Sequence, residues 1–329
     1  MLPDIYISGL GARWPSPTPV AEAIAAGRYD RAEADRAQYT SICVDDKRAA
    51  PELAVLAAAD AVAAADITPD SIETVCYGHA HRLPLDYWNP AGYVARELGI
   101  ARCALVEITG GCAAGIGTIQ IACAYLAAGF THAVLATAAD CWPARQLDRY
   151  RTNSGIVLAD GAAAAVVTRT PGPLQILSAY STGDPSLEAL HRGDDEWYTD
   201  PPDADKRARA FRSVMPPVST KRHLVTGLRA AVSHVLKDAE VGSADDLALI
   251  LLPGVGVELF STNYLRPLGI DAERTNWCFS RTTGHFGAAD QLAALSALGS
   301  SGTLASGDLV LLVGEGTGFA WSAAVIRIV

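Results

Sequence analysis

One stretch, residues 103–129, constrains the fold more than any other part of the chain. The run from Cys103 to Ile108 is typical of a short strand, and Gly110-Gly111 predicts a sharp turn after it. Cys112 follows directly and precedes a long run of small and apolar residues, which predicts a helix that is buried on nearly every face. A strand that feeds a buried helix through a tight turn favours a layered α/β fold.

The position of Cys112 predicts a reactive thiol. At the start of a helix, the helix dipole and the free N–H groups favour a thiolate. The same N–H groups can hold the oxyanion of a thioester under attack, and a sharp turn exposes the sulfur as a nucleophile elbow exposes its serine. The alternative is that Cys112 is a small buried hydrophobe, as most free cysteines are. The local sequence leaves both interpretations open.

Composition excludes several classes of protein. Half of the 329 residues are apolar, which is enough for a large core, and no apolar run reaches the length of a membrane span. The net charge of -10 argues against a nucleic-acid partner. The seven cysteines are odd in number and show no metal-ligand spacing, so we expect neither a disulfide framework nor a zinc site. The first residues lack a signal-peptide pattern, so we expect a cytoplasmic protein.

Strands and helices are predicted to alternate along the chain. Strands are expected near residues 5–11, 73–78, 131–138, 162–169, 174–180, 247–252, 276–280, 308–313 and 321–328, and helices near 20–26, 51–65, 91–98, 221–239 and 257–265. Residues 282–298 are expected to form a turn and a helix. Residues 28–48 are expected to form a charged loop. Residues 182–220 are expected to be irregular and to serve as a lid or an entrance.

Two halves of the chain carry a similar pattern. THAVLATAAD followed by DGAAAAVVTRT resembles GDLVLLVGEG followed by GTGFAWSAAVIRIV, since each is a buried strand, a turn and a second strand that ends in arginine. Pro171-Gly172-Pro173 is the strongest punctuation between them. We predict a duplicated five-layer αβαβα fold, with one half in residues 1–172 and the other in residues 173–329.

Four motifs in this order resemble a known family. They are GGCAAG after a strand, DGAAAAVV, TTGHFGAADQLAAL and GDLVLLVGEGTGFAWSAAVIRI. The set resembles the thiolase superfamily, most closely ketoacyl-ACP synthase III. The resemblance implies the duplicated αβαβα fold, a homodimer and an acyl-cysteine intermediate. It also implies a donor that is an acyl carrier protein or coenzyme A thioester, with no other cofactor. It places the nucleophile at Cys112 and the oxyanion hole at the backbone N–H groups of Cys112 and Thr317.

The sequence departs from the family at two positions. The condensing enzymes carry a catalytic histidine in a His-Gln-Ala-Asn run, where this chain has Gly254. They also carry an asparagine after a glycine, where this chain reads Gly284-His285. The two donors that stabilise the enolate after decarboxylation are therefore missing. This argues against decarboxylative condensation.

The substituted positions predict a different chemistry. An imidazole beside a thiol can act as a base, and a carboxylate behind the imidazole fixes its tautomer. Cys112, His285 and Asp290 would form such a triad, which is similar to the ketoacyl-synthase-III-like acyltransferases of antibiotic and polyketide pathways. We predict transfer of an acyl group from a thioester, through Cys112, to a hydroxyl of a small molecule such as a glycoside, to an amine or to a second carrier. Read alone, His285 is equally a satisfied turn histidine, and Asp290 a first-turn helix residue.

Other residues are predicted to assist. His191 would act as a second base or position the acceptor. Basic residues would dock the carrier protein or the coenzyme A phosphates: Arg207, Arg212 and Arg222 in one cluster, and Arg149 and Arg151 in a rival one. Two alternative functions stay open, a starter-unit ketoacyl-ACP synthase III that makes a carbon–carbon bond, and a non-catalytic partner subunit of a synthase complex.

Overall fold

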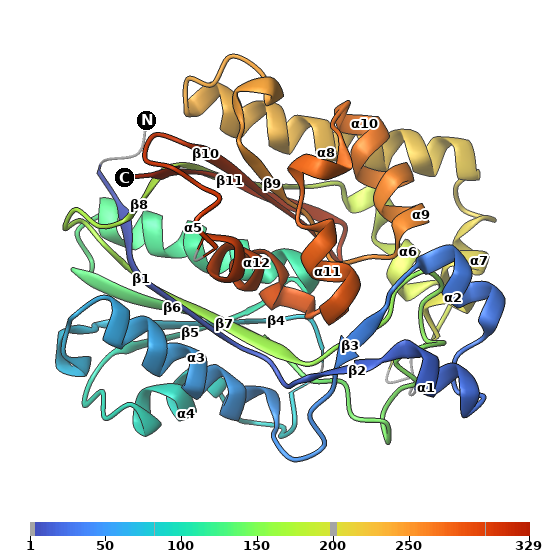
Figure 1. Ribbon diagram of the computed structural model, residues 1–329, viewed down its shortest axis with the longest axis horizontal. Coiled ribbons are helices and arrows are strands. Elements are labelled where there is room, and N and C mark those ends of the chain that lie inside the picture. Colours follow the sequence, from blue (N-terminus) through green and yellow to red (C-terminus); the bar gives the residue numbers. More distant parts are fainter. Residues whose placement is uncertain (1–3, 82, 198–202, 300) are drawn as a thin grey trace.

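A mixed sheet of nine strands forms the centre of the molecule. The computed structural model describes residues 4–81, 83–197, 203–299 and 301–329. Within them the strand order is β5-β4-β6-β7-β1-β8-β11-β10-β9 (Figure 1). The strands are β1 (Tyr6–Arg13), β4 (Thr74–His79), β5 (Ala104–Thr109), β6 (Ala133–Asp140), β7 (Gly161–Thr168), β8 (Leu174–Gly183), β9 (Leu249–Leu251), β10 (Leu309–Gly316) and β11 (Ala320–Ile328). A separate two-stranded sheet pairs β2 (Pro17–Pro19) with β3 (Ser41–Cys43).

Helices lie in three layers around the strands. Figure 1 shows α3 and α4 on one outer side, α8 on the other, and α5 with α12 between the two halves of the sheet. The helices are α1 (Val20–Ala25), α2 (Arg31–Ala37), α3 (Ala50–Ala64), α4 (Pro90–Glu97), α5 (Ala114–Ala127), α6 (Ala189–Arg192), α7 (Ala204–Phe211), α8 (Pro217–Asp238), α9 (Val257–Phe260), α10 (Arg266–Leu268), α11 (Trp277–Thr283) and α12 (Asp290–Gly299). The predicted layered α/β architecture is thus observed.

The two halves of the sheet repeat one pattern. In the first half β4 runs parallel to β6, β6 pairs antiparallel with β7, and β7 pairs antiparallel with β1. In the second half β9, β10, β11 and β8 repeat these directions in the same order. Within the sheet, the two halves pair where Tyr6 and Ile7 of β1 meet Gln175 and Leu174 of β8. This repeat supports the division at residues 172 and 173, which stays a prediction.

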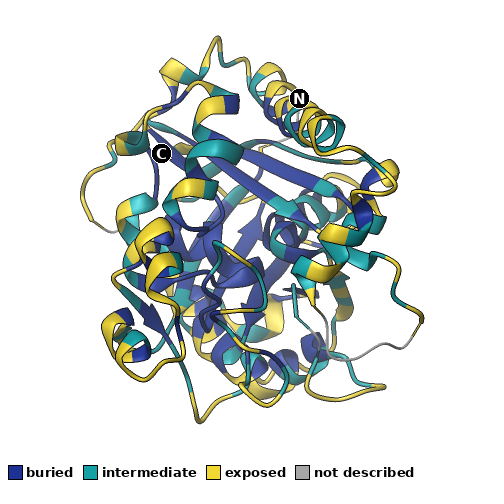
Figure 2. Ribbon diagram, turned by 90° about the vertical axis from the view of Figure 1, so that its right-hand side faces the viewer, coloured by how far each residue is buried: buried dark blue, intermediate teal, exposed yellow. Residues whose placement is uncertain are grey.

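The helices of the central layer, α5 and α12, carry almost no charged residues, and this composition allows them to be buried. Figure 2 shows the dark blue buried residues concentrated in the strands and inner helices, and exposed residues on the outer helices. In α5 the predicted burial holds for most of the helix, with Ile116, Ile119 and Leu126 almost fully buried, but Tyr125 is half-buried and Ala124 is exposed. Gly115 lets α5 approach the turn before α12, since a Cβ at this position would overlap the carbonyl oxygen of Ala288. This close approach fixes the distance between the two parts of the candidate site.

Three local predictions were wrong. Residues 28–48 are not a loop throughout, because α2 begins where Asp30 caps it, with Glu33 N donating to Asp30 Oδ1 at 3.0 Å. Residues 276–280 form the start of α11 and not a strand. There Asn276 bonds both N and O of Leu252 through its side chain, which draws the segment across the end of β9. The segment 182–220 is not irregular throughout, because its described residues include α6, α7 and the start of α8.

None of the described helices combines the length and the apolar composition that a membrane crossing requires.

Candidate active site

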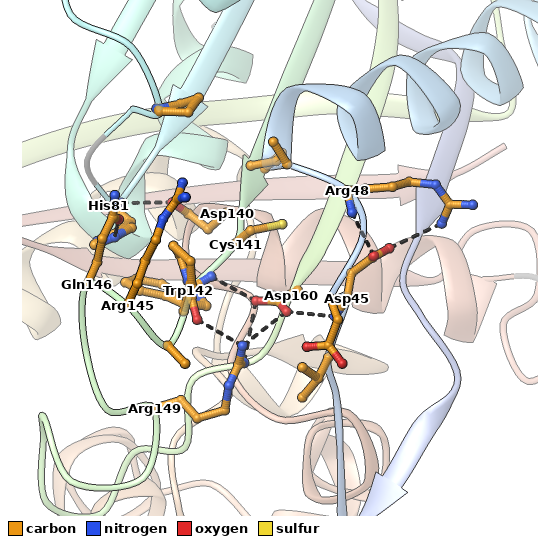
Figure 3. A pocket seen from close by; sticks show the side chains of 18 of the residues that line it. Asp45, Arg48, His81, Asp140, Cys141, Trp142, Arg145, Gln146, Arg149 and Asp160 are labelled. Atoms are coloured by element: carbon orange, nitrogen blue, oxygen red, sulfur yellow. Dashed lines mark hydrogen bonds and ion pairs between the residues drawn. The ribbon is translucent and has the colours of Figure 1, made fainter.

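A cavity of about 750 Å³ opens where β4 and β6 end. Figure 3 shows its wall, in which Trp142 and Arg149 lie near Asp160. The guanidinium of Arg149 donates to Asp160 Oδ2 at 3.2 Å and to the carbonyl oxygens of Trp142 and Leu158. These contacts compensate the charge of the guanidinium, so Arg149 is poorly placed to dock a phosphate or an acidic carrier protein. Neither Cys112 nor His285 lines this cavity.

Cys112 lies in a tight turn directly before α5, as predicted. The turn is a single 3₁₀ turn, Gly111–Ala113, that follows β5. Gly111 has φ +58°, and a Cβ there would lie 2.7 Å from the backbone N of Thr317. A Cβ on Gly316 would overlap the carbonyl oxygen of Gly110. Only glycines allow the Cys112 turn and the Gly316–Thr317 loop to lie in contact.

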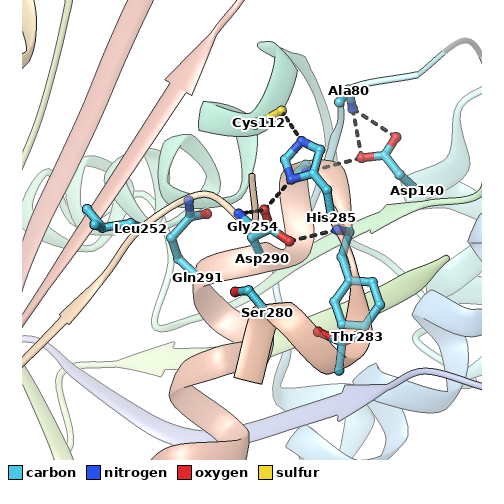
Figure 4. A network of polar contacts seen from close by, with 12 residues as sticks. Ala80, Cys112, Asp140, Leu252, Gly254, Ser280, Thr283, His285, Asp290 and Gln291 are labelled. Atoms are coloured by element: carbon cyan, nitrogen blue, oxygen red, sulfur yellow. Dashed lines mark hydrogen bonds and ion pairs between the residues drawn. The ribbon is translucent and has the colours of Figure 1, made fainter. Parts of the chain in front are cut away.

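A chain of hydrogen bonds joins the three residues of the predicted triad. Cys112 Sγ lies 2.9 Å from His285 Nε2, and His285 Nδ1 lies 2.5 Å from Asp290 Oδ2 (Figure 4). The side chains of His285 and Asp290 are only 3% and 4% exposed. The structure therefore brings together a thiol from one half of the chain and an imidazole and a carboxylate from the other.

Backbone N–H groups hold Asp290 in place. Phe286 N donates to Asp290 Oδ1 at 2.7 Å, and Gly254 N donates to Oδ2 at 2.7 Å. A Cβ on Gly254 would lie 2.9 Å from the carbonyl oxygen of Gly284. Gly254 therefore donates its backbone N–H to the carboxylate. There is no space at this position for the histidine that the condensing enzymes carry.

The environment of His285 favours the imidazolium. Burial disfavours its charge, but the negative charges of Asp290 and Cys112 outweigh burial and raise the pKa of His285 well above its usual value. The hydrogen bond from Nδ1 to Asp290 leaves Nε2 directed at Cys112. A proton that leaves the thiol is thus stabilised on His285.

Asp140 was missed by the sequence analysis, although it ends the buried strand β6. Its carboxylate accepts hydrogen bonds from the backbone N–H groups of Ala80, His81 and Ala288, the last at 2.8 Å. Burial outweighs these bonds and raises the pKa of Asp140 to about 6. Gly287 has φ +62°, and a Cβ there would overlap Asp140. Asp140 therefore anchors the turn that carries His285 to the end of β4.

His191 lies in α6 with its ring stacked on Phe319, at a centroid distance of 5.2 Å. Its Nδ1 is buried and has no hydrogen-bond partner among the described residues. Burial and the nearby Arg207 charge lower the pKa of His191. The ring is therefore a neutral group with unused hydrogen-bonding capacity, close to the strand that follows Thr317.

The remaining basic residues differ in their availability. Arg207 donates to Asp195 Oδ2 at 2.6 Å and to the carbonyl oxygen of His191, so its charge is largely compensated. Arg151 donates to the carbonyl oxygen of Gly27 at 2.7 Å and stays 57% exposed. Arg212 and Arg222 are exposed. Arg222 lines a second cavity of about 390 Å³ beside α8.

Two further polar groups near the site escaped the sequence analysis. Glu315 is an acidic residue within the otherwise apolar strand β10, and this was the signal that could have revealed it. Burial raises the pKa of Glu315 to about 7, against the lowering effects of Tyr264 and Trp321. Burial, followed by the charges of Glu315 and Cys112, raises the pKa of Tyr264 well above its usual value. Tyr264 and Glu315 thus belong to one buried polar pair.

Within the part of the chain that the structure describes, no group of three or more His, Cys, Asp or Glu side chains is placed to hold a metal ion.

Comparison with known proteins identifies the family. The model of 3-oxoacyl-[acyl-carrier-protein (ACP)] synthase III matches residues 106–185, and the model of its C-terminal part matches residues 236–328. A beta-ketoacyl-[acyl-carrier-protein] synthase III from Desulfotalea psychrophila is 26% identical over 279 residues, which cover 84% of this chain and 83% of that protein. The matched ranges include the Cys112 turn, the His285 turn and the last two strands.

Solved structures extend the similarity to nearly the whole chain. The acyltransferase ChlB3 is similar with a TM-score of 0.95 and 29% identity, and the match covers 99% of this chain and 98% of ChlB3. The 3-oxoacyl-(acyl carrier protein) synthase III, FabH, from Pseudomonas aeruginosa PAO1 has a TM-score of 0.81 at 20% identity and shares the fold over 99% of both chains. The predicted αβαβα thiolase fold is confirmed. The chain is an enzyme of the ketoacyl-ACP synthase III-like branch of the thiolase superfamily.

Proposed function

We propose that the protein is an acyltransferase that works through an acyl-Cys112 intermediate. The observation that carries this proposal is the chain of hydrogen bonds from Cys112 Sγ through His285 to Asp290. A base that is oriented by a carboxylate is the arrangement that activates a nucleophile for acyl transfer. The similarity to ChlB3, which is described as an acyltransferase, supports the same interpretation.

In the loading step, His285 holds the thiol proton and Cys112 attacks as the thiolate. The sulfur forms a bond to the thioester carbonyl carbon, and the bond from that carbon to the donor sulfur breaks. The donor thiolate leaves and takes the proton from His285 Nε2. The N–H groups of Cys112 and Thr317 would hold the oxyanion, since Gly111 and Gly316 bring these two backbone segments together.

In the transfer step, the acceptor hydroxyl gives its proton to His285 and attacks the acyl carbon, and the bond to Cys112 breaks. Loading of Cys112 should lower the pKa of His285. The charge of Cys112 is one of the influences that raise the pKa of His285, and acylation removes this charge. The pKa of His285 then falls toward the range of an effective general base. Asp290 stabilises the imidazolium that forms.

Condensation with a decarboxylated malonyl unit is the weaker candidate. That reaction needs two donors for the enolate oxygen. The backbone N–H of Gly254 is already bound to Asp290, and His285 is bound to Asp290 and Cys112. We therefore favour a hydroxyl acceptor, with an amine or a second carrier thiol as alternatives. The presence of a thiol, base and carboxylate in hydrogen-bond contact argues against a non-catalytic partner subunit.

The donor is proposed to be an acyl thioester of a carrier protein or of coenzyme A. The relatives named above are synthases whose names include the acyl carrier protein. Arg212 and Arg222 are exposed and could meet an acidic carrier protein or phosphate groups, and Arg151 is a further exposed cation. We propose no cofactor other than the phosphopantetheine of the donor. A cytoplasmic location and a role in an antibiotic or polyketide pathway stay predictions.

The first test is intact-protein mass spectrometry after mixing with acyl-CoA and acyl-carrier-protein thioesters. We expect a mass gain equal to the acyl group, and we expect it to vanish in Cys112→Ala. In His285→Ala, transfer of a loaded acyl group should slow by about a hundredfold or more. Loading that persists in Cys112→Ala would contradict the proposal. So would carbon dioxide release from malonyl thioester in step with product formation.

A further inference from the structure

The cavity of about 750 Å³ at the ends of β4 and β6 takes no part in the acyl transfer proposed above. Its volume falls in the range of sites that hold small organic molecules. Three separate loops form its polar wall: the loop before α3, the loop after β4 and the loop after β6 (Figure 3). β4 and β6 are parallel, and the carboxyl ends of parallel strands are where α/β folds bind ligands.

The carboxylates in the wall are mostly engaged within the protein. Asp160 accepts a hydrogen bond from the guanidinium of Arg149 at 3.2 Å, and Asp45 accepts one from Arg48 at 3.1 Å. Asp140 accepts hydrogen bonds from backbone N–H groups of the loop after β4 and of the turn before α12. The charges of these acids are therefore compensated without a bound cation.

Three cations of the wall have no such compensation. Arg28, Lys47 and Arg145 line the cavity, and none of their side chains forms an ion pair or a hydrogen bond with a described residue. All three are exposed, so an anion could meet them without breaking an existing contact. Among the described carboxylates of the wall, only that of Asp46 also has no partner. The uncompensated charge is thus mainly positive, in a protein whose net charge is -10, and it favours a negatively charged ligand.

The backbone adds to this preference. Ala49 and Ala50 line the cavity at the N-terminus of α3, a helix of 15 residues. The dipole of a helix favours negative charge at this end. The rings of Tyr77, Trp142 and Tyr150 also line the cavity, and they offer contact to the carbon atoms of a ligand.

The kind of cation selects the anion. Each guanidinium can bind two oxygen atoms, and a lysine ammonium binds oxygen as a point charge. A phosphoryl group offers three strong acceptor oxygens and a charge of nearly two, whereas a carboxylate offers two oxygens and one charge. Two arginines and a lysine from different loops therefore match a phosphoryl group better than a carboxylate.

The wall also touches the segments that carry the catalytic residues. Asp140 accepts a hydrogen bond from Ala288 N at 2.8 Å, in the turn between His285 and α12. His79 lines the cavity as well, and its Nε2 lies 3.1 Å from the hydroxyl of Thr109, at the end of the strand that leads to the nucleophile. Because neither catalytic side chain lines the cavity, the reacting end of a thioester donor does not lie in it. A ligand held here is therefore a neighbour of the reaction and not a participant.

We infer that this cavity binds the phosphoryl group of a small molecule other than the acyl donor, held by Arg28, Lys47 and Arg145 at the N-terminus of α3. No bond forms or breaks in this binding. The inference goes beyond the proposed acyl transfer, because the site binds its ligand whether or not Cys112 is loaded.

The test is isothermal titration calorimetry of the full chain with inorganic pyrophosphate as the probe, at low ionic strength because salt screens exposed charges. We expect saturable binding to the wild type, and a rise in Kd of about tenfold or more in Arg145→Gln and in Arg28→Gln, since each variant loses a charge-assisted hydrogen bond. The matched control is Arg169→Gln, an exposed arginine at the end of β7 opposite Asp160, which should bind as the wild type. Succinate, a dianion without a phosphoryl group, should bind about tenfold more weakly or not at all.

A second measurement separates the two sources of a phosphoryl group. The acyl group that loads Cys112 is offered as its coenzyme A thioester and as its pantetheine thioester, which has no phosphate. In Arg145→Gln we expect the KM of both donors to be unchanged while pyrophosphate binding is weakened. A KM that rises for the coenzyme A thioester alone would assign the cavity to the phosphates of the donor and overturn a separate ligand.

The remaining outcomes are equally decisive. The inference fails if pyrophosphate shows no saturable binding to the wild type, if Arg145→Gln and Arg28→Gln bind it unchanged, if Arg169→Gln weakens it as much, or if succinate binds as tightly. Equal melting temperatures of the variants exclude misfolding as the cause. A protein that binds pyrophosphate but is loaded by no thioester keeps this site and overturns the proposed function alone.

Discussion

At the scale of single residues, the site depends on groups whose charge is set by burial. His285 and Asp290 were predicted from the motif TTGHFGAADQ, because five residues across a turn can place a carboxylate behind an imidazole. Asp140 and Glu315 were not predicted, since their importance depends on which backbone N–H groups and rings surround them. Those neighbours come from distant segments, such as Ala288 beside Asp140. The local sequence marks Glu315 as an acidic residue in an apolar strand, but it does not show which distant groups surround it.

Glu315 makes stability depend on pH in a direction that can be measured. Its pKa is raised from 4.5 to about 7 in the folded protein. The unfolded chain therefore loses its proton first, and stability falls as pH rises from about 4.5 through 7. We expect the stability of Glu315→Gln not to fall in this way. The free energy of unfolding of the variant, relative to that of the wild type, should therefore increase by on the order of 1–3 kcal/mol between pH 5 and pH 8. Thermal melts at both pH values measure this difference. A difference that stays constant with pH would show that the carboxyl is ionised in the fold.

At the scale of elements, glycines fix how closely the site-bearing segments approach. We expect Gly115→Ala to force α5 away from the turn at Ala288, since a Cβ there overlaps the carbonyl oxygen of Ala288. His285 would then move relative to Cys112, and both the melting temperature and the loading rate should fall. The matched control is Gly117→Ala in the same helix, where a Cβ would lie 3.7 Å from Ile108. That change should stabilise by up to about 1 kcal/mol through helix propensity. Similar melting temperatures for the two variants would contradict this account.

Elements were predicted well where a single pattern decides, and poorly where tertiary contacts decide. The helix α5 and the strands β6, β7, β10 and β11 follow from long apolar runs between glycine turns. Residues 276–280 also carry an apolar stretch, but Asn276 bonds the backbone of Leu252, and the segment that follows becomes α11. No short-range pattern separates these two cases, because the deciding partner lies 24 residues away.

At the scale of the whole molecule, the nine-stranded sheet has an exposed edge at β5. Ala104 N donates to Glu73 O, so the N–H groups of Leu105 and Glu107, which alternate with it, point outward. Leu105 is 46% exposed. Exposed edges with apolar side chains invite pairing with another strand. A second copy of this chain, pairing β5 against β5, would supply the predicted homodimer.

This edge gives a direct test of the dimer. We expect Leu105→Lys to weaken self-association by tenfold or more, since each copy would bring a lysine charge into the paired edge in place of an apolar side chain. The matched control is Val218→Lys on α8, where an apolar side chain that is 83% exposed is replaced in the same way. Sedimentation equilibrium of both variants and the wild type measures the change.

A dimer that survives Leu105→Lys but not Val218→Lys would place the interface on α8, beside Arg222, and would remove that surface from the proposed docking site. A dimer that dissociates only with Leu105→Lys leaves Arg212 and Arg222 free for the donor, so the oligomer test also decides which face a carrier protein can approach.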